Sequence, residues 1–229
     1  MSVSKIQFRG DDAPLAFDEV LSRFKRCGCN LLVTGEVAQE VTALASRRLM
    51  GAPFEDRKRL LVLTDSEAKG VGAHLPGAAV ADDDSVKVVR QEISSRSAAT
   101  RAGSAPQSRT VGSDLQALED AISEGISEFQ MESDDLDPAE LRLSVNSLYP
   151  LLVEHDYTEV TRFIRRVGDM VSDANGMAHY HLPVPEGSET VESVATLFDA
   201  RVELRRNGPK AEQRWHVPTY GQQTNWVGL

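Results

Sequence analysis

Short apolar runs alternate along the chain with segments in which apolar residues recur at helical spacing. A short apolar run bounded by turn residues predicts a buried strand, and helical spacing predicts an amphipathic helix. The strand-like runs lie at 30–34, 59–65, 86–90, 140–148 and 176–182. The helical segments lie at 15–28, 38–50, 115–129, 153–171 and 191–197. Because strands that alternate with helices are joined by parallel crossovers, we expect an α/β fold.

The chain closes on strand-like runs alone. Residues 200–204, 213–217 and 225–227 read as three strands joined by Gly and Pro turns. Strands that follow one another through tight turns pair antiparallel. The expected fold is therefore α/β, with a mainly parallel sheet, helices on both faces and antiparallel terminal strands.

The pattern predicts one domain. Residues 1–14 are polar and are expected to form a loose N-terminus, and residues 15–229 are expected to form the domain. The segment 94–112, rich in Ser, Ala and Gly and dotted with Arg, has no apolar periodicity and predicts a flexible loop. Strands on both sides of this loop are needed for one sheet, so it does not divide two cores.

Charge and composition restrict the compartment and the partners. The formal net charge is −10, with 19 Arg against 6 Lys. Excess acid with scarce Lys is typical of an acidic, halophilic protein from a high-salt cytoplasm, although an Arg-favouring GC-rich genome is an alternative. An acidic chain repels phosphate backbones, so bulk charge does not favour general nucleic-acid binding.

The cysteines and the hydropathy pattern favour a cytoplasmic protein. Cys27 and Cys29 are separated by one residue and have no further Cys or His beside them, so we expect reduced structural thiols. No apolar run approaches the roughly 18 residues of a membrane span, and the first residues do not resemble a signal peptide. We expect no contact with a membrane.

The segment 35–42 nearly matches a phosphate-binding loop. Such a loop has the form G-x-x-x-x-G-K-[ST], follows a strand and opens a helix, so that backbone N–H groups, the Lys and the hydroxyl hold phosphate and magnesium. Gly35 and Thr42 stand at the right spacing, but Glu40 replaces the second Gly and Val41 replaces the Lys. Acids also bind helix N-termini, so Glu36 or Glu40 is an alternative partner for those amides.

With these residues in view, segments 31–51, 60–65 and 141–152 resemble the KaiC/RecA-like ATPase superfamily. The stretches GMAHYHLPVPEGSETV, LFDARVELR and QRWHVP are similar to an uncharacterised group of haloarchaeal proteins that carry this fold in degenerate form. The resemblance covers about residues 15–229 and implies a RecA-like sheet. It places the metal-binding Asp on Asn146 and the water-activating acid pair near Thr64 and Asp65, where one acid remains.

Several parts of the ancestral site are thus replaced, and the resemblance implies a pseudo-ATPase that is not an enzyme. It leaves no catalytic residues and no metal site. It also implies no cofactor, although weak binding of ATP and magnesium stays open. The residual nucleotide-binding set is Gly35, Glu36, Thr42, Asp65 and Asn146. For Gly35 and Thr42 the alternative is an ordinary strand–helix turn, and for Asp65 it is a helix cap.

His179 and His181 lie two residues apart on one strand face. They could bind metal or shuttle protons, but two His without a third spaced ligand are a weak signal, and a polar strand face or a packing feature of the family is the favoured interpretation. Their role stays undetermined at this point.

Three functions remain. The leading hypothesis is a non-catalytic regulatory or scaffold protein, active in signalling or regulation, that contacts protein partners such as an active KaiC/RecA-like relative or a second copy. The alternatives are a nucleic-acid-associated regulator of transcription or repair, using the Arg-bearing loop 94–112, and a nucleotide-binding switch with residual ATP binding. Fold analogy alone connects the resemblance to any of them.

Overall fold

The structure is a computed structural model that describes residues 17–64, 71–77, 84–92, 108–133 and 135–229. Asp65, the expected loose N-terminus and most of the 94–112 segment lie outside the described residues. None of the described helices is both long and apolar enough to cross a membrane.

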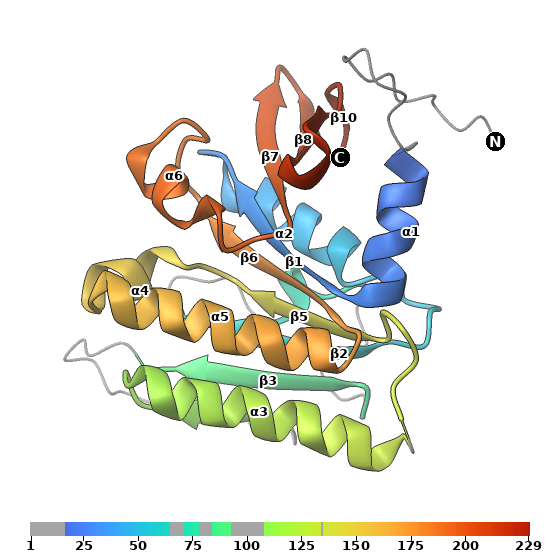
Figure 1. Cartoon of the computed structure of the whole chain (residues 1–229), viewed down its shortest axis with the longest axis vertical. Helices are drawn as coiled ribbons and strands as arrows, with labels where there is room; N and C mark the ends of the chain where they lie inside the picture. The colour runs from blue at the N-terminus through green and yellow to red at the C-terminus, as the bar shows by residue number, and fades with distance from the viewer. Residues whose placement is uncertain (1–16, 65–70, 78–83, 93–107, 134) are drawn as a thin grey trace.

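Within the described ranges the strands form a single sheet in the order β10-β8-β7-β1-β6-β5-β2-β3-β4, with β9 paired to β8 (Figure 1). The seven strands from β7 to β4 are parallel, and β8, β9 and β10 pair antiparallel. The bounds are β1 Cys29–Thr34, β2 Lys58–Leu63, β3 Val86–Gln91, β4 Ser108–Val111, β5 Leu141–Val145, β6 Met177–Leu182, β7 Ala200–Asn207, β8 Lys210–Val217, β9 Gln222–Gln223 and β10 Val227–Gly228. The expected α/β class, with a mainly parallel sheet and antiparallel terminal strands, is confirmed.

Helices cover both faces of the sheet. The helices are α1 Phe17–Cys27, α2 Gln39–Leu49, α3 Leu115–Glu132, α4 Tyr149–Glu154, α5 Tyr157–Asp173 and α6 Glu189–Ala195, with 3-10 turns at Val71–Ala73 and Pro218–Tyr220. α3 to α6 pack their apolar residues on one face, where Figure 1 shows α3 and α5 lying along the strands. α1 and α2 pack on the other face, against β1, β7 and β8.

Burial follows each strand's place in the sheet. Every residue of β1, β5 and β6 is buried, as expected for parallel strands covered on both faces. β7 instead alternates buried and half-buried residues, because one of its faces lies beyond the covering helices. The parallel centre is therefore apolar on both sides, while the antiparallel end presents a polar face.

Two expectations were wrong in detail. The segment 153–171 was expected to be one helix, but α4 ends at Glu154 and α5 begins at Tyr157, because His155 and Asp156 have extended backbones. The last part of the expected loop 94–112 is strand β4, which pairs with β3 from Ser108 to Val111. The open edge of β3 supplies hydrogen bonds that the composition of the segment does not reveal.

Candidate functional site

The turn between β1 and α2 is the segment with phosphate-loop spacing, and it is closed against β7. Gly35 has a φ of +115°, which favours glycine, and its N–H donates to the carbonyl of Val184 at 2.9 Å. A Cβ added to Gly35 would lie 2.3 Å from the carbonyl oxygen of Leu204. Glycine stands here because two backbones meet, which is a structural reason independent of phosphate.

Helix α2 begins inside the expected loop. Its first residue is Gln39, so Thr42 lies in the first turn, and the N–H groups of Val41 and Thr42 both donate to the carbonyl of Ala38. Val41, at the position of the phosphate lysine, is only 3% exposed and packs in the core with α1, β1 and β7. The Glu36 side chain is exposed. The lysine position therefore faces the protein interior.

Asn146 follows β5 and holds the end of that strand to the end of β2. Its Oδ1 accepts hydrogen bonds from the Thr64 N–H at 2.7 Å and from the Thr64 Oγ1 at 3.1 Å, and the same hydroxyl contacts the Ser147 carbonyl. Asn146 and Thr64 are both buried. One strand, β6, separates β5 from β1, which places Asn146 about two strand spacings, or roughly 10 Å, from the Gly35 turn.

The structure thus places Gly35, Glu36 and Thr42 in one turn and Asn146 on a different strand. Each has a described structural role or an exposed side chain, and the membership of these four in a nucleotide site stays a prediction. Asp65, the fifth expected member, is outside the described residues.

A charged cluster that sequence reasoning missed lies at the carboxyl ends of β1 and β6. Thr34 Oγ1 donates to the Glu186 carboxylate at 2.5 Å, and Arg201 Nε donates to the other Glu186 oxygen at 2.7 Å. On the neighbouring hairpin, Glu203 accepts from Arg214 Nε at 2.5 Å and lies 3.0 Å from His216 Nε2. Every charge in the cluster has an opposite partner, so it holds the end of the sheet together.

The sequence feature that could have predicted this cluster is the alternation of charged residues along β7 and β8. Arg201, Glu203 and Arg205 lie two residues apart, and so do Glu212, Arg214 and His216. The register pairs Glu203 with Arg214, which brings opposite charges onto one face. Further along this face, Arg205 and Arg214 both stack on the Trp226 ring, with the guanidinium carbons 3.9 and 4.6 Å from the ring centroid.

A group of buried histidines lies between the sheet and α2. His179 and His181 are almost completely buried, and their rings meet edge to face with centroids 5.2 Å apart. His179 Nε2 lies 3.3 Å from the Ser46 Oγ of α2, and His74 is buried nearby. Both ring nitrogens of His181 and the Nδ1 of His74 have no hydrogen-bond partner among the described residues.

Burial keeps these imidazoles uncharged. It lowers the pKa of His181 to about 3, with a smaller contribution from His74. Burial also lowers the pKa of His179 well below 6.5, helped by His181, Arg142 and His74. The pKa of His74 falls through burial and the nearby Arg47. In the described part of the chain, no three His, Cys, Asp or Glu side chains are arranged to hold a metal ion.

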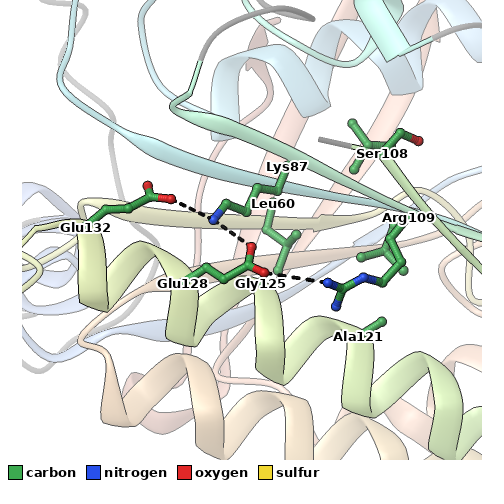
Figure 2. A pocket seen from close by; sticks show the side chains of 10 residues that line it. Leu60, Lys87, Ser108, Arg109, Ala121, Gly125, Glu128 and Glu132 are labelled. Carbon is green, nitrogen blue, oxygen red and sulfur yellow. Dashed lines mark hydrogen bonds and ion pairs between the residues drawn. The ribbon is translucent and has the colours of Figure 1, made fainter. Parts of the chain in front are cut away.

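A pocket of about 270 Å³ lies between α3 and strands β2, β3 and β4 (Figure 2). Lys87 reaches into it, with its Nζ 2.8 Å from Glu128 and 3.0 Å from Glu132, and 4.4 Å above the Phe129 ring. Arg109 at the pocket wall pairs with Glu124 and also lies 3.6 Å from Glu128. Because carboxylates already neutralise both cations, this pocket is a poor site for an anionic ligand.

Comparison with known proteins identifies a family but no activity. The model of a family described as "Family of unknown function (DUF7504)" matches residues 28–204, which is more than half of the chain. The match runs from the glycine before β1 into β7 and so spans the parallel part of the sheet. No curated protein matches the chain.

Replacing Gly35 by Ala should destabilise the fold strongly. The added methyl group meets the Leu204 carbonyl and forces a disfavoured backbone conformation, so we expect a loss of about 2 to 4 kcal/mol in the free energy of unfolding. Gly187→Ala is the matched control, because a Cβ there meets nothing within 4 Å. Chemical denaturation measures both, and equal stabilities would contradict the closed turn.

Restoring the phosphate lysine should also unfold the protein. Val41→Lys buries an ammonium group without a partner, and we expect it to lower the free energy of unfolding by about 3 to 5 kcal/mol. Gln39→Lys, on the exposed first turn of the same helix, should leave stability nearly unchanged. A Val41→Lys protein as stable as Gln39→Lys would show that position 41 faces solvent.

The buried histidines should make the fold sensitive to acid. Their pKa values are lower in the folded chain than in the unfolded chain, so below pH 6.5 the unfolded chain binds more protons. The free energy of unfolding is therefore highest with respect to these histidines above pH 6.5, where they are neutral in both states, and it declines as the pH falls toward about 3. His181→Leu should reduce the slope of stability between about pH 6 and 5 by ~1.4 kcal/mol per pH unit. An unchanged slope, measured by denaturation across this range, would contradict a neutral His181.

Proposed function

We propose a role for this chain from the geometry of its fold. The chain belongs to a family of unknown function, DUF7504. The chain is a non-catalytic regulatory or scaffold protein that keeps a RecA- or KaiC-like frame and acts through contacts with other proteins. Its partner is an active relative of the same fold or a second copy of itself. It requires no nucleotide and no metal ion for this role.

The observation that carries the proposal is the orientation of Val41. A phosphate loop needs a cation at this position to neutralise the phosphates. Removing such a charge-assisted contact costs about 1.5 to 3 kcal/mol, or roughly ten- to 150-fold in affinity. Here the position holds an apolar side chain in the core, and the adjacent Glu40 adds negative charge on the exposed side of the helix. Both features act against triphosphate binding.

Asn146 supports the same reading. A hard cation such as Mg²⁺ prefers carboxylate oxygens, and the amide oxygen of Asn146 already accepts two hydrogen bonds from Thr64. A ligand at this oxygen would have to break the connection between β5 and β2. The arrangement around Asn146 therefore favours a structural role, in which it joins β5 to β2, over metal binding.

The other candidate functions have less support. Arg109, the described arginine of the segment proposed for nucleic-acid contact, is paired with Glu124 and Glu128, so its charge is already compensated.

A cytoplasmic location in a high-salt cell is part of the proposal. Two free cysteines, Cys27 exposed and Cys29 buried, fit a reducing compartment, and burial raises the pKa of the Cys29 thiol, which makes it unreactive.

Titration calorimetry with Mg-ATP in molar KCl tests the proposal. We expect no binding heat up to millimolar ATP, no thermal stabilisation by ATP, and no ATP turnover above background. Thr42→Ala should behave like the wild type, as should Thr219→Ala, an exposed control outside the turn.

Stoichiometric binding that Thr42→Ala weakens and Thr219→Ala preserves would overturn the proposal in favour of a nucleotide-controlled switch. Stoichiometric turnover would make the chain an enzyme with a substituted site.

A further inference from the structure

Exposed apolar side chains gather at one place on the surface. Among the described residues the large apolar side chains that are exposed are Phe54, Met131, Tyr149, Val153 and Tyr157. The last three lie within nine residues of one another, and their exposures are 51%, 66% and 51%. Isolated exposed apolar residues are ordinary, but a contiguous group marks an interaction surface.

These three side chains lie on two helices at the carboxyl end of the sheet, and one of them contacts a third helix. Tyr149 and Val153 are one turn apart on α4, and Tyr157 is the first residue of α5. The Tyr157 hydroxyl donates to the Ser193 carbonyl of α6 at 2.6 Å, which fixes the ring beside that helix. Figure 1 shows α4, the start of α5 and α6 at the same end of the molecule. We call Tyr149, Val153 and Tyr157 the α4–α5 patch.

Acidic residues surround the α4–α5 patch. Glu154, Asp156 and Glu159 are exposed on α4 and the start of α5, and Glu189 and Glu192 are exposed on α6 beside Ser193. In the described ranges none of these five carboxylates forms an ion pair. Residues 143–161 and 167–200 contain no Lys or Arg. The bases between them include Arg162 and Arg166, which line a pocket with Glu159 on the side of α5 that faces α3. Away from that pocket, the rim formed by Glu154, Asp156, Glu189 and Glu192 is acidic.

We propose that the α4–α5 patch binds a basic amphipathic segment of a partner protein, with aliphatic side chains flanked by Lys or Arg. This inference rests on the proposed function and names the surface and the chemistry of the partner. Apolar contact with the two tyrosines and Val153 supplies affinity, and the rim attracts the basic flanks and determines their orientation.

Charge decides between this partner and the alternatives. A second copy meeting this surface around a two-fold axis would bring the same acidic rim against itself, which is repulsive. Nucleic acid and anionic lipid carry phosphates, which the rim also repels. A basic segment is the partner that satisfies both the apolar centre and the acidic rim.

The probe is a synthetic amphipathic helical peptide with Leu along one face and Lys along the other. Titration calorimetry should show binding of one peptide per chain, about tenfold tighter than binding of a peptide with the same composition in a shuffled order. A version with Glu in place of Lys should not bind. Affinity should fall as KCl rises, because the rim contributes through charge.

Matched variants locate the site. Tyr149→Ser with Val153→Ser, and separately Glu189→Gln with Glu192→Gln, should each weaken the peptide about tenfold. Phe54→Ser and Met131→Ser remove equally exposed apolar groups elsewhere, and Asp169→Asn removes an exposed charge further along α5, so these controls should stay within about twofold of the wild type. All of these side chains are on the surface, so the fold should persist.

Equal binding of the shuffled peptide, or equal losses in the controls, would overturn the α4–α5 patch as the docking surface. Preferential binding of single-stranded DNA or of anionic vesicles to this face would overturn it as well. Nucleotide binding, by contrast, would refute the proposed function and not the surface, so the two failures are distinguishable.

Discussion

The close contact between Gly35 and the Leu204 carbonyl determines how the centre of the sheet is built. It joins the end of β1 to β7 without space for a side chain, and the Gly35 N–H is bonded to Val184 after β6. Helix α2 begins four residues later, at Gln39. In this helix Val41 lies in the core and Ser46 lies beside His179. This close backbone approach thus lies beside the turn that leads into the helix covering the histidines.

The polar layer beneath α2 follows from that placement. Ser46 lies within hydrogen-bond distance of Ser144 and His179, and its hydroxyl reaches the His74 carbonyl. Buried imidazoles without partners reduce stability, so this layer contributes to the position of the helix more than to the free energy of unfolding. The serine contacts add defined polar contacts between α2 and the sheet to the apolar packing of the helix. Because the imidazoles are buried, this arrangement requires them to be neutral, and it is therefore favoured only above the acidic pH range.

Much of this fold could be predicted from the sequence because its strands are local apolar runs. The runs at 30–34 and 176–182 became β1 and β6 almost residue for residue. The break between α4 and α5 was missed because Tyr157 continues the helical pattern across two extended residues. The spacing of Gly35 and Thr42 identified the strand–helix turn, but spacing alone cannot tell which side of α2 faces the core. The pairing of Thr64 with Asn146 requires contact between residues 82 apart, which a single sequence does not reveal.

The carboxyl end of a parallel sheet is where α/β proteins usually bind ligands. Among the described residues at that end, Glu186 holds Thr34 and Arg201, and Asn146 holds Thr64. In the described part of the chain, the α4–α5 patch with its acidic rim stays exposed at the same end. A ligand site whose donors are internally satisfied has no strong attraction for a small anion, but an apolar surface beside it retains its tendency to leave water. We therefore propose that this end of the fold binds a basic protein segment in place of phosphate.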